Sequence, residues 1–280
     1  MGKNKSWVAG HLAGGLGNRL FQHAAAAGLA EKWNRPLVFH RARCEATGHG
    51  PLNSIFKLLP DVPHVYDGKS EMLGEKQNHV FTYSPFPDKD SHPSKNICVD
   101  GFRQTDLYFP SKGIHVKFES ALDQETMRTL LETYKLTTQE ERKTTWFLHM
   151  RFGDYTILPH HQIDIGAYYS KAIQLIPQDH RILVFSDEAT QYKDFLLKLF
   201  TSLGRTVTIV ENENEVESLY LMAYCWGGAV VANSTYSWWG AYFAKQRCPG
   251  DYTAIYPAVW GAGLPEAKHI VPSWGTKITL

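Results

Sequence analysis

The feature that most constrains this chain is an alternation of short apolar runs with longer helical patterns in its second half. The apolar runs that predict strands lie at residues 145–150, 181–187, 206–210 and 229–232. The patterns that predict helices lie at residues 167–176, 191–203, 216–224 and 236–245. Strands that alternate with helices favour a parallel sheet covered by helices, so this half is expected to form a Rossmann-like unit.

The first half opens with the same alternation around a glycine-rich turn. The expected elements are a strand at 7–12, a glycine loop at 13–19, a helix at 20–33 and strands at 36–39 and 97–102. A glycine loop between a strand and a helix is typical of the opening of a doubly wound α/β domain. We therefore expect a second Rossmann-like unit here.

Composition shifts along the chain suggest where these units divide. Residues 44–96 are rich in Pro, Gly, His and Ser and are expected to form a loop-rich insertion. A helix is expected within 120–134, and the polar stretch 135–145 is typical of a linker. The predicted domains are therefore an N-terminal, acceptor-side domain over 1–140 and a C-terminal, nucleotide-sugar-binding domain over 141–280.

Overall composition excludes several classes of protein. With 29 Lys and Arg against 28 Asp and Glu, the 280 residues carry a net charge of +1, whereas nucleic-acid-binding proteins usually show a basic excess. The chain is not expected to be disordered, because 43% of its residues are apolar and 20% are charged. Its four widely spaced cysteines indicate reduced thiols. Its first residues contain no apolar stretch typical of a signal peptide or anchor, so a cytoplasmic protein without a transmembrane segment is expected.

Polar residues follow the first strand of the second half. In H-M-R-F-G-D-Y (149–155), His149, Arg151 and Asp154 are expected at the carboxyl end of a parallel strand, where open α/β sheets bind ligands. The fork of donors on Arg151 suits a pair of phosphates, and Asp154 could act as a base or orient the arginine. A surface ion pair beside a core histidine is an equally good interpretation of these residues alone.

Two further polar blocks follow predicted strands. In S-D-E (186–188), the carboxylates could bind a ribose or a base, although capping of the next helix is the favoured interpretation of this block alone. In N-S-T-Y-S-W-W-G (233–240), hydroxyls and the N–H groups of a helix start predict an anion site suited to a pyrophosphate. Trp238 and Trp239 could stack on a sugar, but at least one of them is expected in the core. The N-glycosylation sequon at Asn233 is a poor acceptor between a strand and a helix.

No metal site is expected from the sequence. The thirteen histidines form no H-E-x-x-H motif, and no D-x-D triplet occurs. The glycine loop at 13–19 gives a phosphate or a sugar room near the backbone, which is weak evidence by itself.

Together, seven blocks resemble the α-1,2-fucosyltransferases of glycosyltransferase family 11, in the same order. G-G-L-G-N-R-L-F-Q-H-A-A-A (14–26) is similar to the family's G-G-L-G-N-Q-M-F-Q-Y-A-A, and H-M-R-F-G-D-Y is similar to its H-V-R-R-G-D-Y. The other similar blocks are D-G-F-R-Q-T-D-L-Y-F (100–109), A-Y-Y-S-K-A-I (167–173), F-S-D-E (185–188), S-L-Y-L-M (218–222) and N-S-T-Y-S-W-W-G-A-Y (233–242). The combination covers nearly the whole chain and is far more specific than any single block.

The resemblance implies an α/β, GT-B-like fold with two Rossmann-type domains and a cleft between them. It also implies an inverting, metal-independent enzyme that moves fucose from GDP-fucose to a hydroxyl of a glycan acceptor, with no other cofactor. By this analogy Arg151 binds the diphosphate and stabilises the charge on the leaving GDP, with Asp154 beside it. The residues expected to bind the donor are His149, Asp187, Glu188, Glu217, Asn233, Ser234, Thr235, Ser237, Gly14, Gly15, Gly17, Asn18 and Arg19. The residues expected at the acceptor are Phe152, Tyr155 and Trp238.

Two departures from the family pattern bear on the donor. Phe152 stands where the family has a second arginine, which removes one positive charge. Ser218 stands where the family has an aspartate, at a position expected to read guanine, and Glu217 could substitute for it. If neither residue reads guanine, another nucleotide sugar such as UDP-xylose is the alternative donor. A carbohydrate- or nucleotide-binding protein that lost catalysis is a third interpretation, against which the presence of Arg151 and Asp154 weighs.

Overall fold

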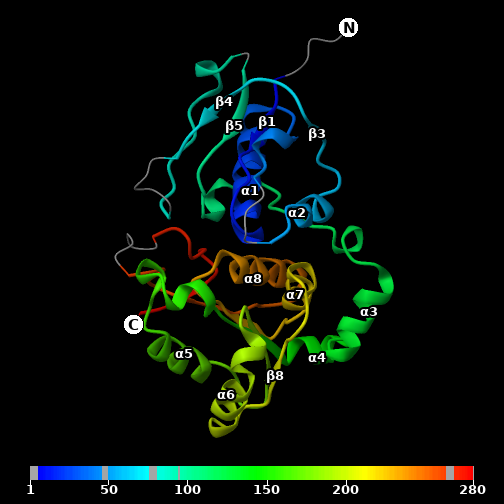
Figure 1. Ribbon diagram of the computed structural model, residues 1–280, viewed down its shortest axis with the longest axis vertical. Helices are drawn as coiled ribbons and strands as arrows, with labels where there is room; N and C mark the ends of the chain where they lie inside the picture. The colour runs from blue at the N-terminus through cyan, green and yellow to red at the C-terminus, as the bar shows by residue number, and fades with distance from the viewer. Residues whose placement is uncertain (1–5, 46–49, 76–80, 94, 263–267, 280) are drawn as a thin grey trace. The chain divides into compact units, whose positions relative to one another are not determined.

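The computed structural model of the protein describes residues 6–45, 50–75, 81–93, 95–262 and 268–279. Contacts between residues divide the chain into two compact units. The N-terminal unit comprises residues 1–121 and 268–272, and the C-terminal unit comprises residues 122–267 and 273–280. Parallel strands and helices build each unit (Figure 1).

The C-terminal unit contains a six-stranded parallel sheet. Its strands are β6 (Thr145–Met150), β7 (Arg181–Ser186), β8 (Val207–Ile209), β9 (Gly228–Val230), β10 (Ala254–Pro257) and β11 (Thr276–Ile278). Their spatial order is β11-β10-β9-β6-β7-β8, so the first strand along the chain lies in the interior of the sheet. This is the order of dinucleotide-binding folds, with its reversal between β6 and β9. The four predicted strands are confirmed, and β10 and β11 are two that the sequence patterns did not indicate.

Helices cover both faces of this sheet (Figure 1). They are α5 (Ile165–Gln174), α6 (Ala189–Ser202), α7 (Glu215–Ala223) and α8 (Thr235–Arg247). Trp146, Leu148 and Met150 of β6 share a buried cluster with residues of α5 and α6. α7 and α8 pack together on the other face. All six residues of β6 are buried, as expected for a parallel strand that is covered on both faces.

The polar stretch at 135–145 belongs to the C-terminal unit and does not separate two domains. It contains α4 (Gln139–Lys143), which begins with a capping box between Thr138 and Glu141. α3 (Gln124–Thr133) precedes it, and the Tyr134 hydroxyl donates to Glu213 of the same unit at 2.6 Å. The polar residues of this stretch therefore form and cap a short helix. The division between the units follows residue 121 rather than residue 140.

The N-terminal unit repeats the doubly wound arrangement. Its strands are β1 (Val8–Gly10), β2 (Phe39–His40), β3 (His64–Val65), β4 (Ser70–Leu73) and β5 (Asn96–Val99). β5 pairs with both β1 and β4, and a bridge between Val8 and Leu37 brings the β2–β3 pair to the other side of β1. β1 is an edge strand of the three-stranded sheet β1-β5-β4, and its free side pairs with residues 36–38 ahead of β2. β1 therefore has β5 on one side and the segment that leads into β2 on the other, which is where the order of the strands reverses.

α1 (Leu16–Trp33) follows β1 and packs on it through small side chains. Gly28 has no room for a side chain, because a Cβ there would lie 1.9 Å from the carbonyl oxygen of Tyr108. The helix ends at Asn34, whose φ of 51° provides a left-handed C-cap. The insertion expected to be irregular, 44–96, holds α2 (Asn53–Leu58) together with β3 and β4. These elements are too short for their periodicity to be recognised in the sequence.

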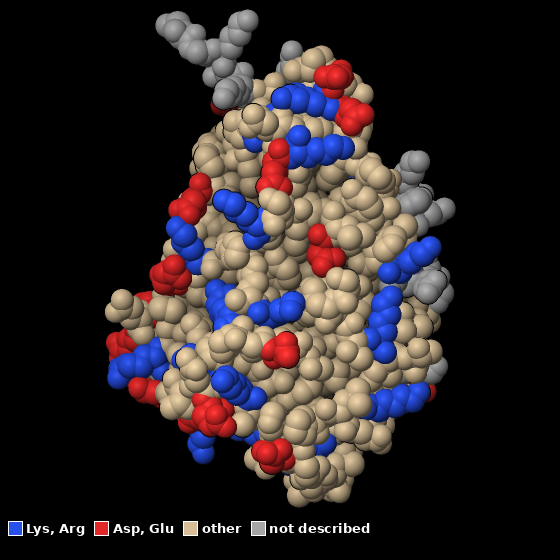
Figure 2. Space-filling view, turned by 180° about the vertical axis from the view of Figure 1, so that it is seen from behind, with Lys and Arg blue, Asp and Glu red and all other residues tan. Residues whose placement is uncertain are grey.

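Charged side chains of both signs are interspersed over the face shown in Figure 2, in keeping with the net charge of +1. All four cysteines are free thiols. None of the described helices combines the length and the apolar character that crossing a membrane requires.

Tyr168 allows a test of how the sheet of the C-terminal unit is held together. Its side chain is fully buried, and its hydroxyl lies 2.6 Å from the Val231 oxygen and 2.9 Å from the Ile255 oxygen. We expect Tyr168→Phe to lower the free energy of unfolding by about 1–3 kcal/mol, because buried carbonyls lose a donor. Urea unfolding followed by tryptophan fluorescence measures this, since six of the eight tryptophans lie in this unit.

The matched control for this substitution is Tyr66→Phe, at a position that is 68% exposed. It should change the free energy of unfolding by less than about 0.5 kcal/mol. Equal stability of the two variants would contradict a structural role for the Tyr168 hydroxyl.

Candidate functional site

The reversal of strand order between β6 and β9 fixes where the C-terminal unit can bind a ligand. Open α/β sheets bind ligands outside the carboxyl ends of the strands at such a reversal. Arg151 directly follows β6, and the segment 231–234 leads from β9 into α8. Because Leu148 of β6 pairs with Val230 of β9, the sequence blocks 149–155 and 233–240 meet at one edge of the sheet. Their contact is direct, since the rings of His149 and Tyr236 lie 5.9 Å apart.

Arg151 is held between two carboxylates at this edge. Its Nη2 lies 2.6 Å from Oδ1 of Asp154, and its Nη1 lies 3.2 Å from Oδ2 of Asp187. The guanidinium also lies over the ring of Tyr155, 5.3 Å from its centroid. The Arg151 side chain is 28% exposed, so it is accessible while its orientation is fixed from three sides.

A stack of rings continues from Arg151 into the following loop, which forms the 3-10 turns Gly153–Thr156 and Pro159–His161. The rings of Tyr155 and His161 lie 4.4 Å apart and nearly parallel, and the ring of His160 lies 4.3 Å from that of His161. Burial, followed by the charge of His160, lowers the pKa of His161. Burial raises the pKa of Tyr155 to about 12, so its hydroxyl keeps its proton. The histidine pair thus extends the stack that supports Arg151.

His149 lies on β6 itself, beneath this loop. Its side chain is 5% exposed, and its backbone oxygen accepts a hydrogen bond from the Tyr169 hydroxyl at 2.6 Å. Burial, reinforced by the charge of Arg151, lowers the pKa of His149 to about 3, so the imidazole is neutral near pH 7. Within the part of the chain that is described, nothing hydrogen-bonds to its Nδ1. A buried polar atom of this kind is stabilised when a ligand supplies the missing partner.

The start of α8 supplies the second side of the site. Ser234 is the N-cap of this 13-residue helix, and within the described residues its own side chain makes no capping hydrogen bond. Asn233 donates from Nδ2 to the backbone oxygens of His161 at 2.8 Å and Trp260 at 2.9 Å, and Ser237 is fully buried with its hydroxyl 3.3 Å from the Ser234 oxygen. Asn233 and Ser237 therefore brace the loop and the helix start, and Ser234 is buried while Thr235 is half-buried at the same end of the helix. Donor binding by these residues stays a prediction.

Two of the other carboxylates predicted to bind the donor, Asp187 and Glu217, have partners within the unit. Asp187 accepts the Phe152 N–H at 2.9 Å in addition to its ion pair with Arg151. Glu188 is the N-cap of α6, and its backbone N–H donates to Ser186 Oγ at 3.1 Å. Glu217 accepts the N–H of Asn214 at 2.8 Å and so completes the capping box of α7. Binding of ribose or base by these residues stays a prediction.

Two of the predicted acceptor residues lie in the core. Phe152 is 7% exposed, and its ring packs 4.4 Å from that of Tyr192. Trp238 is fully buried against Tyr242, with ring centroids 5.5 Å apart, and Trp239 is fully buried as well. The sequence patterns did not indicate this burial of Phe152, and contact of Phe152 and Trp238 with an acceptor stays a prediction. Tyr155 remains half-buried beside Arg151.

In the N-terminal unit the glycine loop is built as predicted, but its arginine is not exposed. Gly14 has a φ of +78°, and a Cβ there would lie 2.9 Å from Nδ2 of Asn18, so glycine is required. Gly15 is the N-cap of α1, and Gly17 lies in its first turn. Arg19 is fully buried and donates to the Pro51 oxygen at 3.0 Å. The guanidinium of Arg19 thus contacts the backbone at residues 50–51, and its binding of the donor stays a prediction.

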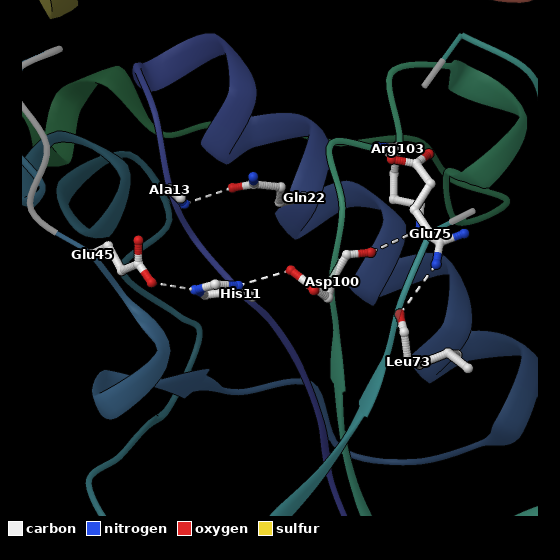
Figure 3. A network of polar contacts seen from close by, with 8 residues as sticks. All are labelled: His11, Ala13, Gln22, Glu45, Leu73, Glu75, Asp100 and Arg103. Carbon is white, nitrogen blue, oxygen red and sulfur yellow. Dashed lines mark hydrogen bonds and ion pairs between the residues drawn. The ribbon is translucent and has the colours of Figure 1, made fainter. Parts of the chain in front are cut away.

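Sequence analysis missed a polar group at the strand reversal of the N-terminal unit (Figure 3). His11 follows β1 and Asp100 follows β5, and Nδ1 of the imidazole lies 2.8 Å from Oδ1 of the carboxylate. Nε2 of His11 lies 2.8 Å from Oε1 of Glu45. His11 and Asp100 lie near the carboxyl ends of the strands predicted at 7–12 and 97–102, and this position is the signal that could have found them. No group of three or more His, Cys, Asp or Glu suited to a metal ion occurs in the described ranges.

The neutrality of buried His149 predicts a pH effect on stability. Between its folded pKa of about 3 and the ordinary value of 6.5, the unfolded chain takes up a proton that the folded chain does not. The C-terminal unit should therefore lose about 1–2 kcal/mol from this residue as the pH falls from 7.5 to 5. In His149→Gln the loss over this range should be smaller by that amount, as measured by urea unfolding at both pH values. Identical pH dependence in the two proteins would contradict the burial of a neutral imidazole.

Comparison with known proteins gives relatives of one enzyme class. The O-antigen biosynthesis glycosyltransferase WbnK of Escherichia coli is 34% identical over 155 residues, which are 51% of this chain and 48% of WbnK. The match therefore spans about half the length of that relative. An alpha-1,2-colitosyltransferase of Escherichia coli is 24% identical over 266 residues, 85% of this chain and 87% of that protein. No protein-family model matches the chain.

Solved structures of fucosyltransferases share the fold. The selenomethionine form of the fucosyltransferase NodZ from Bradyrhizobium is 14% identical with a TM-score of 0.50, over 85% of this chain and 92% of that chain. POFUT1 in complex with GDP is 11% identical with a TM-score of 0.50, over 91% of this chain and 99% of that chain. The predicted α/β, GT-B-like fold is thereby confirmed. The relatives and structural neighbours are glycosyltransferases, fucosyltransferases among them.

Proposed function

We propose that this protein is an inverting, metal-independent glycosyltransferase that moves fucose from GDP-fucose to a hydroxyl of a glycan acceptor. We further propose that it belongs to the α-1,2-fucosyltransferases of glycosyltransferase family 11. The observation that carries the proposal is the meeting of Arg151 with the start of α8 at the carboxyl edge of β6 and β9. The glycosyltransferase names of the sequence relatives support the same reaction class.

A diphosphate needs concentrated N–H donors, and this edge supplies them. Arg151 has five N–H donors in a fixed fork, two of which are engaged by Asp154 and Asp187. The N-terminus of α8 adds backbone N–H groups and the positive end of a helix dipole. The hydroxyls of Ser234 and Thr235 lie at the same end of the helix. We place the pyrophosphate of the donor between these two elements of the C-terminal unit.

The charges around Arg151 bear on the proposed role of Asp154. Two carboxylates beside one guanidinium leave a negative sum, so net charge alone would not attract a diphosphate. The carboxylates instead hold the guanidinium in one orientation, so that its remaining donors need no ordering when the donor binds. The 2.6 Å bond supports the orienting role for Asp154 over its role as a base.

In the proposed reaction, the acceptor oxygen attacks C1 of fucose on the side opposite to GDP. The bond between C1 and the phosphate oxygen breaks, and its electron pair leaves on GDP, so the β-linked donor becomes an α-linked product. Arg151 and the start of α8 stabilise the negative charge as it develops on the β-phosphate. A divalent cation performs this task in metal-dependent enzymes, and here fixed donors of the chain perform it.

We propose that the nucleotide of the donor is GDP and that its sugar is fucose. POFUT1, which shares the fold, holds GDP in its structure, and this chain resembles the fucosyltransferases of family 11 in seven blocks. The relative named for colitose, a sugar that lacks one ring hydroxyl of fucose, makes that sugar a second candidate. UDP-xylose and a binding protein without catalysis are the outcomes to be distinguished by experiment.

A nucleotide panel tests the donor. Saturating GDP should raise the melting temperature more than UDP at the same concentration, because a ligand that binds only the folded state stabilises it by mass action. Differential scanning fluorimetry with GDP, UDP and ADP measures the order. A larger shift with UDP would contradict the GDP-fucose proposal and favour UDP-xylose. Binding of GDP without turnover of GDP-fucose or GDP-colitose on any acceptor would favour the binding protein.

Substitution of Arg151 tests the site. Arg151→Ala should reduce kcat by about 10²–10³, as expected when one donor to the developing charge is lost. Arg151→Lys should retain part of this activity, since it keeps the charge but not the fork. The matched control is Arg128→Ala in the same unit, where the arginine side chain is 66% exposed, and it should leave kcat unchanged. Activity of Arg151→Ala within threefold of the wild type would exclude Arg151 from the mechanism, and loss of activity in EDTA would exclude metal independence.

A further inference from the structure

The loop after β6, residues 152–162, connects Arg151 to the start of α8 through side-chain contacts that the proposed reaction does not use. We propose that Tyr155, His161 and Asn233 are positioning residues that fix the separation between Arg151 and the N-terminus of α8, so that the site prefers a diphosphate to a monophosphate. This inference rests on the proposed donor site and deepens it, because it assigns that preference to three side chains, the positioning group. All of them belong to the C-terminal unit.

The two ion pairs of Arg151 leave one movement of its guanidinium unrestricted. Asp154 holds Nη2 at 2.6 Å and Asp187 holds Nη1 at 3.2 Å. Contacts at two nitrogen atoms of a planar group permit a rotation about the line that joins them. The ring of Tyr155, whose centroid lies 5.3 Å from the guanidinium carbon, opposes this rotation because it covers the face of the group. Tyr155 therefore supplies the third contact that a fixed orientation requires.

Tyr155 is in turn held by His161. The two rings lie 4.4 Å apart with an angle of 6° between their planes, and the ring of His160 lies 4.3 Å from that of His161. Burial, followed by the charge of His160, keeps the pKa of His161 below 6.5, so above pH 7 its ring is mainly neutral when it stacks on Tyr155. The position of Tyr155 therefore depends on where the chain places His161.

Asn233 fixes His161 relative to α8. Its side chain is buried, and Nδ2 donates to the His161 oxygen at 2.8 Å and to the Trp260 oxygen at 2.9 Å. Because Asn233 directly precedes Ser234, the N-cap of α8, these bonds attach the loop to the start of the helix. A single amide group thus joins the loop that supports Arg151 to the end of the helix that offers free N–H groups.

Hydrogen bonds within the loop restrict its own movement. The Thr156 N–H donates to the Phe152 oxygen at 3.0 Å, and Nε2 of Gln162 donates to the Thr156 oxygen at 2.9 Å. The oxygen of Gln162 accepts the N–H of Ala262 at 2.9 Å. The loop is therefore fixed at its two ends and in its middle, so its rings hold one position rather than several.

A fixed separation matters for a ligand with two phosphates. When GDP binds, one phosphate can contact Arg151 while the other contacts the N-terminus of α8, and the second contact requires no further ordering if both elements are already in place. GMP has one phosphate and gains nothing from the separation. Without the positioning group, GDP loses the part of its affinity that depends on both contacts, whereas GMP keeps its single contact.

Isothermal titration calorimetry of the full chain with GDP and with GMP at pH 7.5 tests the positioning group. The wild type should bind GDP about 10–100-fold more tightly than GMP, since the second phosphate adds charged hydrogen bonds. Tyr155→Leu keeps an apolar side chain but removes the ring, and it should weaken GDP binding about 10-fold and GMP binding by no more than about twofold. His161→Leu should act in the same way, because Tyr155 loses the ring on which it stacks.

Asn233→Ser shortens the side chain that bonds to His161 and should also weaken GDP binding more than GMP binding. Its melting curve establishes whether this buried substitution leaves the chain folded, and the two ring variants carry the test if it does not.

Conservative and matched variants separate positioning from general support of the fold. Tyr155→Phe keeps the ring and should return the affinity for GDP to within about threefold of the wild type. Ile157→Ala lies in the same loop at a position that is 74% exposed, and it should leave the Kd of both nucleotides unchanged.

The outcomes distinguish this inference from the proposed function. Affinity for GDP within about threefold of the wild type in both ring variants would overturn the positioning group. An equal loss of affinity for GDP and GMP would overturn it as well, because that pattern indicates damage to the whole site. Either result leaves the proposed function intact if the wild type prefers GDP to GMP. A wild type that binds both nucleotides equally would contradict the pyrophosphate site itself, and with it the proposed function.

Discussion

The placement of the first strand of each unit between two neighbouring segments of the chain is the constraint on which the sites of this protein depend. The chain adds strands on one side of that strand and then on the other, so one pair of neighbouring strands must carry connections that leave in opposite directions. Between these two neighbouring strands, no crossover connection passes over the carboxyl edge of the sheet. The C-terminal unit meets this condition between β6 and β9, and the N-terminal unit meets it between β1 and β5. Arg151 follows the first of these pairs, and His11 with Asp100 follows the second.

Both groups place a cationic side chain between two carboxylates. Arg151 is bonded by Asp154 and Asp187, and His11 by Asp100 and Glu45. Such pairing keeps partly buried charges solvated by the protein, and it explains how a chain of net charge +1 can hold strongly polar sites without a broad basic surface. The two groups differ in whether the side chain can lose its proton. A guanidinium keeps its proton at all accessible pH values, whereas an imidazole can release and accept one.

Sequence patterns were sufficient for the parts of the structure that are continuous along the chain. β6 with the block 149–155, and β9 with the start of α8, could be placed because each motif directly follows its strand. Sequence patterns were not sufficient where the partner of a side chain is distant or the element is short. The burial of Arg19 depends on the carbonyl of Pro51, and nothing near Arg19 in the sequence indicates that contact.

The same limit explains why the group at the N-terminal edge was missed. Asp100 and Glu45 reach His11 from 89 and 34 positions away. Only the sheet topology brings them together.

The two carboxylates beside each cation also have a consequence for selectivity. A ligand must bind the side chain more strongly than the carboxylate that already contacts it. A diphosphate can do so at Arg151, because it offers several charged oxygens where Asp154 offers one contact.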